Sequence, residues 1–261
     1  MGHRRLGRLP KTVGWKKLIA ALDSADIDAA LVAELTAKET KERLLALADD
    51  PAINYAQWLL TRIVWLSRGD QFSEELQAIG VNIPTDAHAV QFFSRLFDHA
   101  EKEMRARSGA TPFVSFVEQA LRQTLTETVN LRTTTLFGTR MPDIQAACKE
   151  YSTKKGFGIL AKRFYSNVLD RFVNYFVQRE ISNHIGPGRR LDSIEEATKF
   201  TESIRTYCLQ SARIVEDFAA SWYSKHTWMT KGQLTEGDVR PLTSYALTKL
   251  QMEMAREDVI K

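Results

Sequence analysis

The segment Ser221–Trp228 interleaves aromatic side chains with cations, a pattern suited to nucleic-acid binding. Trp222, Tyr223 and Trp228 offer flat faces on which bases can stack, and Lys225 can meet a phosphate. A protein partner suits the same residues, because tryptophan and tyrosine often supply most of the binding energy at protein interfaces. Trp222 would then anchor the core while Trp228 docks the partner. We therefore predict a stacking or docking role for these three aromatic residues.

A second candidate is the segment from His184 to Arg190, which contains two glycines and a pair of adjacent arginines. Glycine lets the backbone turn sharply, and Arg189 and Arg190 beside exposed amides suit an anion such as phosphate. The alternative is a helix stop at Gly186–Pro187, with the arginines paired to nearby acids. The sequence leaves both interpretations open.

Residues 1–22 form a basic arm that contains no acidic side chain. The cations predicted to contact an anion or a nucleic acid in this arm are Arg4, Arg5, Arg8, Lys16 and Lys17. Over the whole chain, 36 basic residues face 32 acidic ones, so the net charge of +4 is small. Such a balance permits nucleic-acid binding without requiring it.

The best candidates for a metal site are His88 and His99, which fall on one face of a predicted helix. A metal needs at least three convergent ligands, however, and histidines three or four residues apart are the usual arrangement on a helix. A solvated polar face explains the pair better. The chain also contains no phosphate-binding loop, nucleophile elbow or zinc-protease motif. We predict no catalytic residue, no cofactor and no metal ligand.

The two cysteines, Cys148 and Cys208, lie in predicted helices without a CxxC motif, and we expect them to be reduced and buried. No apolar run approaches the ~20 residues that a membrane span needs. Lys16 and Lys17 interrupt the stretch that a signal peptide would require. These features together predict a cytoplasmic protein with no membrane association.

The elements that position these residues are helices, because apolar side chains recur at intervals of three and four along most of the chain. Asp50–Pro51 and Thr111–Pro112 each combine a capping side chain with proline, a typical helix start. The longest helix is expected to run from Ser193 to Trp222. An extended segment is expected only around Thr133–Phe137. Gly156 and Gly158 indicate a glycine-rich entry to a helix.

The sequence therefore predicts an all-α, irregular bundle of about nine or ten helices, with two subdomains as the favoured organisation. We expect a basic N-terminal arm with a short helix at 1–22, an N-terminal subdomain at 23–108 and a C-terminal subdomain of longer helices at 109–261. The favoured function is a non-enzymatic interaction or adaptor protein, a subunit of a larger assembly with a protein partner. The alternatives are a nucleic-acid-binding protein and an enzyme whose site is assembled from distant helices.

Overall fold

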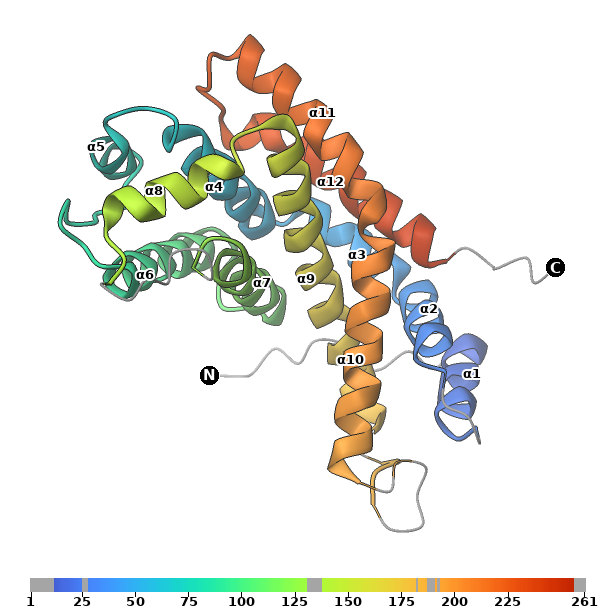
Figure 1. Ribbon diagram of the computed structural model, residues 1–261. Helices are drawn as coiled ribbons and strands as arrows, with labels where there is room; N and C mark the ends of the chain where they lie inside the picture. Colours follow the sequence, from blue (N-terminus) through green and yellow to red (C-terminus); the bar gives the residue numbers. More distant parts are fainter. Residues whose placement is uncertain are drawn as a thin grey trace.

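The computed structural model describes residues 12–24, 28–130, 138–181, 183–186, 191 and 193–255 (Figure 1). The helices of its first half are α1 (Val13–Leu22), α2 (Ala29–Glu39), α3 (Lys41–Ala46), the 3₁₀ helix η1 (Leu47–Asp49), α4 (Pro51–Leu66), α5 (Phe72–Ala78) and α6 (Ala89–Ser108). Those of its second half are α7 (Pro112–Thr128), α8 (Met141–Glu150), α9 (Lys154–Ile181), α10 (Ile194–Ser211), α11 (Arg213–Met229) and α12 (Glu236–Met254).

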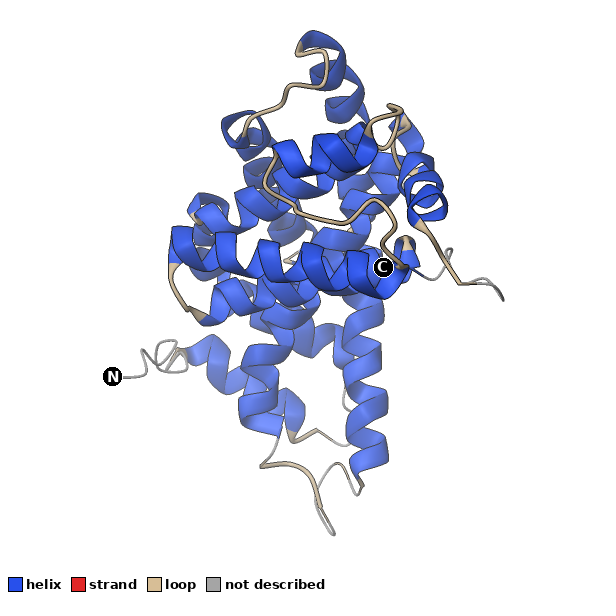
Figure 2. Cartoon of the chain, turned by 90° about the vertical axis from the view of Figure 1, so that its left-hand side faces the viewer, coloured by secondary structure: helices blue, strands red, loops and turns tan. Residues whose placement is uncertain are grey.

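The all-α prediction is confirmed, since the described part of the chain contains helices and loops but no strand (Figure 2). Twelve α-helices are present in that part, a few more than the nine or ten expected. One of the extra helix ends lies at Thr40, where α2 ends and α3 begins. The Thr40 hydroxyl donates to the Thr36 carbonyl at 2.6 Å, a local bond that bends helices. The expected extended segment at 133–137 lies outside the described residues.

The predicted helix starts are confirmed by their capping bonds. An Asp50 carboxylate oxygen accepts from the Ala52 amide at 2.8 Å, and the Thr111 hydroxyl accepts from the Val114 amide at 3.2 Å. Each cap satisfies an amide that has no partner within its helix. These signals are local in sequence, which is why the sequence alone revealed them.

The predicted helix of nearly thirty residues from Ser193 is in fact two helices, α10 and α11, which meet at Ala212. Ala212 keeps φ at −73° while ψ moves to −5°, so the chain changes direction without a helix-breaking residue. Because alanine favours helices, the amino-acid pattern contains no sign of this break. The longest described helix is instead α9, with 28 residues.

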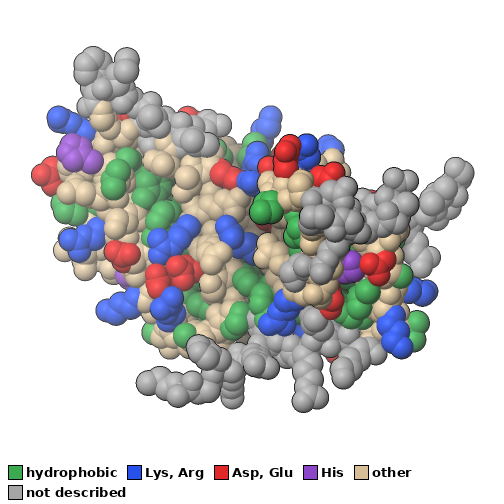
Figure 3. Space-filling view, turned by 90° about the horizontal axis from the view of Figure 1, so that it is seen from below, with side chains coloured by type: hydrophobic (Ala, Val, Ile, Leu, Met, Phe, Trp, Pro, Cys, Tyr) green, Lys and Arg blue, Asp and Glu red, His purple; other side chains and the backbone are tan. Residues whose placement is uncertain are grey.

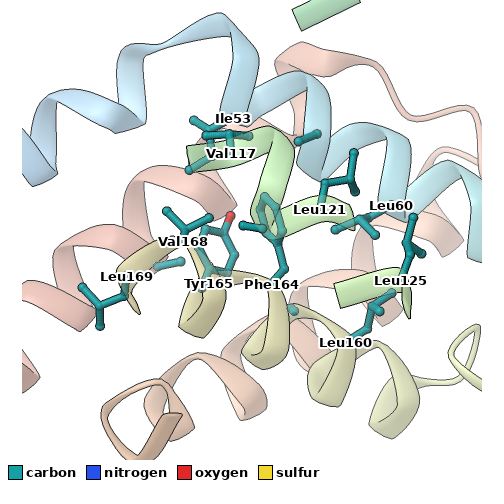
Figure 4. Close-up of a cluster of buried hydrophobic side chains, with 14 of the residues drawn as sticks. Ile53, Leu60, Val117, Leu121, Leu125, Leu160, Phe164, Tyr165, Val168 and Leu169 are labelled. Atoms are coloured by element: carbon teal, nitrogen blue, oxygen red, sulfur yellow. The ribbon is translucent and has the colours of Figure 1, made fainter. Parts of the chain in front are cut away.

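Helix α9 is the centre of the core and packs against α2, α7, α10 and α11. In Figure 4 its Phe164 side chain lies in the same cluster as Leu121 from α7 and Leu60 from α4. All three are at most 1% exposed. Burying a side chain of this size stabilises a protein by ~1.5–3 kcal/mol. Helix α4 is also buried along most of its length and on nearly every face.

Gly156 and Gly158 lie inside the first turns of α9 and allow neighbouring backbone to approach closely. A Cβ atom on Gly158 would lie 2.5 Å from the Glu216 carbonyl oxygen of α11. One on Gly156 would lie 2.3 Å from the Glu150 carbonyl oxygen at the end of α8. The predicted glycine-rich helix entry therefore packs the start of α9 tightly against both neighbours.

The predicted subdomain boundary at Gly109 coincides with the end of α6. Gly109 has φ +70°, a conformation that favours glycine. Buried side chains from both sides of this residue nevertheless belong to one continuous hydrophobic cluster. The division into 23–108 and 109–261 remains a prediction.

No helix in the described ranges combines the length and the apolar character needed to cross a bilayer. On the face seen from below in Figure 3, basic and acidic side chains are interspersed. At the start of α9, near α8 and α11, the charged side chains that line the surface groove described below are all basic.

Candidate functional site: a basic and aromatic groove

The three predicted aromatic residues of α11 occupy different environments. Trp222 is 6% exposed and Tyr223 is 2% exposed, and both rings stack on Phe157 of α9. They attach α11 to α9. Trp228 is 82% exposed, because the helical period of 3.6 residues turns it away from the buried face. A surface role in stacking or docking is therefore open to Trp228, while Trp222 and Tyr223 serve the core.

Trp228 borders a groove with a volume of about 640 Å³, which we call the basic-aromatic groove. Three separate segments form it: the end of α4, the turn between α8 and α9, and the last turns of α11. The turn between α8 and α9 is in the upper half of Figure 1. The lining residues are Trp65, Arg68, Lys149, Ser152, Thr153, Lys154, Tyr223, Ser224, Thr227 and Trp228.

All charged side chains in this set are positive, namely Arg68, Lys149 and Lys154. No acid is present among the described residues that line the groove. None of the three cations forms an ion pair within the described part of the chain. The Arg68 guanidinium lies over the Trp65 ring, 4.6 Å from its centroid, in a cation–π contact that holds it in place. The groove thus offers positive charge that the fold itself does not neutralise.

The turn that carries Lys154 is fixed by Thr153, whose hydroxyl accepts from the Gly156 amide at 3.0 Å and caps α9. The first turn of α9 contains Lys154 and Lys155 and no acid. Acidic side chains are usually favoured in the first turn, because the N-terminal end of a helix carries partial positive charge. Each exposed cation there costs ~0.3–1 kcal/mol at low ionic strength. An anion bound at this end would offset that cost.

The floor of the groove contains the buried Tyr223 hydroxyl, which lies beside the Arg68 guanidinium. It forms no hydrogen bond of good geometry with the described residues. Burial raises the pKa of Tyr223 to about 12, while the positive charge of Arg68 and its loose hydrogen bond to the hydroxyl oppose the rise. Buried polar groups in folded proteins are nearly always well paired, so a hydroxyl with only this loose contact beside a groove suggests a ligand or water as a further partner.

Comparison with known proteins adds nothing to this geometry. No family model, no curated protein and no solved structure matches the chain. Its function must therefore be inferred from its own residues.

The basic arm and the groove are at opposite ends of α9. The Trp15 indole on α1 donates to Glu180 near the end of α9, at 3.2 Å. Lys154 is 26 residues earlier in the same helix, which corresponds to about 39 Å at ~1.5 Å per residue. Lys16 and Lys17 are exposed on α1, so they and the groove do not form one compact site. Lys225 is exposed one turn before Trp228 and extends the positive charge next to the groove.

The other predicted anion contacts, Arg4, Arg5, Arg8, Arg189 and Arg190, lie outside the described residues. The described part of the loop ends at Gly186, where the backbone has φ +128°. Neither the anion site nor the helix-stop interpretation of this loop is tested by the described residues. Both remain predictions.

The hypothesis of a metal site around His88 and His99 lacks the required geometry. His88 is the N-cap of α6, and eleven residues of helix place His99 about 16 Å away. His99 instead contacts Tyr55, with 2.8 Å between its Nε2 atom and the tyrosine hydroxyl. Among the described residues, no three His, Cys, Asp or Glu side chains are grouped to hold a metal ion.

A second polar pocket of about 280 Å³ lies between α7, α9 and α10 and contains Asp170, Arg171 and Asn174. The Asn174 amide donates to Asp170 at 2.7 Å. Burial raises the pKa of Asp170, opposed by the positive charges of Arg205 and Arg171. Acidic and basic groups are therefore both present here. The pocket lacks the one-sided charge of the basic-aromatic groove, and we assign it no function.

Proposed function

We propose that this chain is a non-enzymatic helical interaction protein that binds an anionic partner through the basic-aromatic groove. One observation carries the proposal: three cations without ion pairs in the described structure share a groove whose described lining includes no acid. The exposed Trp228 at its border adds a large apolar surface that the fold does not bury. Unpaired charge and exposed tryptophan together are typical of binding surfaces.

The composition of the groove favours binding over catalysis. Its described lining offers cations, hydroxyl groups and aromatic rings, but no carboxylate or imidazole that would serve as a general base. The proposed compartment is the cytoplasm. Cys148 and Cys208 support it, because both are buried free thiols. Burial raises the pKa of Cys148 to about 12, which keeps the thiol protonated and unreactive.

The test is binding of the full chain to labelled polyanions at low salt, by fluorescence anisotropy. The panel contains polyglutamate, a single-stranded oligonucleotide and a duplex of the same length. The triple variant R68E/K149E/K154E reverses the charge of the groove. The matched control, K41E/R95E/R213E, changes the net charge equally at three exposed cations on α3, α6 and the start of α11.

We expect the wild type and the control to bind at least one polyanion, and the groove variant to lose more than 100-fold in affinity. Failure of the wild type to bind any polyanion at low salt would refute the proposal. Equal losses in both variants would show that general charge, not the groove, is responsible.

A further inference from the structure

We infer that the anionic partner is a single-stranded nucleic acid, with phosphates at the start of α9 and a base stacked on Trp228. This inference rests on the proposed function, because it names the occupant of the same groove. Two features of the groove favour this occupant over an acidic protein, and a third favours it over duplex DNA.

The first feature is the pairing of phosphate-binding groups with a stacking surface. Arg68, Lys149 and Lys154 supply charge, and the start of α9 supplies a helix N-terminus without an acid in its first turn. Trp228 supplies an exposed indole beside them. Cations that follow a backbone, next to an aromatic ring for the bases, are the usual arrangement for single-stranded nucleic acid.

The second feature is the hydroxyl of Tyr223, which lines the groove, lies on a side chain that is 2% exposed and forms no hydrogen bond of good geometry. Its neighbour Arg68 can only donate, so the hydroxyl can still donate a hydrogen bond to a phosphate oxygen or a base carbonyl. The Ser224 hydroxyl is exposed on the same helix and adds a further donor. Hydroxyl groups commonly contact phosphate and sugar in nucleic-acid complexes.

The third feature is the exposed face of the Trp228 indole, which an unpaired base of a single strand can reach. Duplex DNA keeps its bases stacked on one another, which leaves none for Trp228.

The experiment compares two labelled strands of equal length and charge: a thymidine 20-mer and an abasic 20-mer, which has the same phosphates without bases. Polyglutamate and duplex DNA complete the set. We expect the thymidine strand to bind at least tenfold more tightly than the abasic strand. W228A should lose about 5- to 150-fold for the thymidine strand, since stacking contributes that much per base. W228F, which keeps an aromatic face, should retain most of the affinity.

Salt dependence gives an independent readout. Contact with three phosphates predicts that the logarithm of the binding constant falls with the logarithm of salt concentration with a slope of about −2. K149A should make that slope shallower by about 0.7. K154E should weaken binding while raising the melting temperature of the free protein by about 1–5 °C, because it removes a cation from the positive end of α9. A purely structural lysine would not show this opposite pair of effects.

The outcomes separate the two proposals. Preference for the thymidine strand that disappears in W228A supports the inference. Equal affinity for the thymidine and abasic strands, or tighter binding of polyglutamate or duplex, overturns it while leaving an anion-binding groove. No binding to any of the four polyanions refutes the proposed function itself.

Discussion

Phe157 on α9 and Tyr223 on α11 stack almost parallel, with ring centroids 4.2 Å apart and an angle of 15° between the planes. The stack joins the two helices directly beneath the basic-aromatic groove. Its energy comes from the rings, whereas the Tyr223 hydroxyl forms no hydrogen bond of good geometry and has only a loose contact with Arg68. The two parts of this side chain should therefore respond differently to substitution.

Tyr223→Phe keeps the stack and removes the poorly paired hydroxyl. We expect the free energy of unfolding to rise by ~1 kcal/mol, since a buried polar group without a good partner is destabilising. Affinity for the thymidine strand should fall at the same time. Urea unfolding measures the first effect, and F157A, expected to lose ~3–5 kcal/mol, is the control for the ring itself. A loss of stability in Tyr223→Phe would show that the hydroxyl is already satisfied.

Gly158→Ala should destabilise the protein by ~1–3 kcal/mol. The new Cβ would lie 2.5 Å from the Glu216 carbonyl oxygen and 3.1 Å from the Ala220 Cβ, so α9 and α11 must separate. Gly237→Ala is the matched control, because the nearest atom to its new Cβ, the Thr235 hydroxyl, is 3.6 Å away. That change should be neutral or stabilise α12 by up to ~1 kcal/mol. Thermal unfolding of both variants checks the pair, and equal effects would contradict the close helix contact.

The helix ends show which parts of the structure the sequence could reveal. Helix caps such as Asp50 and Thr111 depend on residues one to three positions away, so their pattern is visible in the sequence. The break at Ala212 depends on how α10 and α11 pack on α9, and alanine carries no sign of it. Helix starts can therefore be predicted from local sequence, whereas a helix break caused by packing cannot.

The candidate site divides in the same way. Trp228 and Lys225 are predicted from one short segment, but the cations of the groove come from the turn after α4, from α8 and from the start of α9. Arg68, Lys149 and Lys154 were absent from the predicted contacts because only the fold brings them together. Two adjacent lysines before Gly156, at a helix start with no acid, were the one local signal for part of this site.

His99 should make the protein less stable at mildly acidic pH. Burial lowers the pKa of His99, opposed by Glu103, so the folded state favours the neutral ring. Its contribution to stability is present above its ordinary pKa of about 6.5 and is lost as the pH falls below that value. The melting temperature of H99Q should therefore decrease less than that of the wild type between pH 7.5 and 5. Parallel curves would show that His99 is not responsible, since other groups titrate in both proteins.

Asp170 should show the opposite pH dependence. Burial raises the pKa of this carboxyl group, so ionisation is less favourable in the folded state than in the unfolded chain. The folded state holds the proton more tightly, and the resulting stability is present below the ordinary pKa of ~3.9 and is lost as the pH rises through the raised value. At neutral pH the attraction of Arg205 and Arg171 and the hydrogen bond from Asn174 therefore offset only part of the cost of burying this charge.

Asp170→Asn removes that charge while its side-chain oxygen can still accept from Asn174, as Asp170 does at 2.7 Å. We expect the variant to be more stable than the wild type at pH 7 in urea unfolding, and the difference to shrink steadily towards pH 4. D98N, at an exposed position on α6, should show no such trend. A variant less stable than the wild type at pH 7 would mean that attraction from Arg171 and Arg205 outweighs the cost of burial. Asp170 would then be a stabilising partner in a charge network, and the second pocket would require its negative charge.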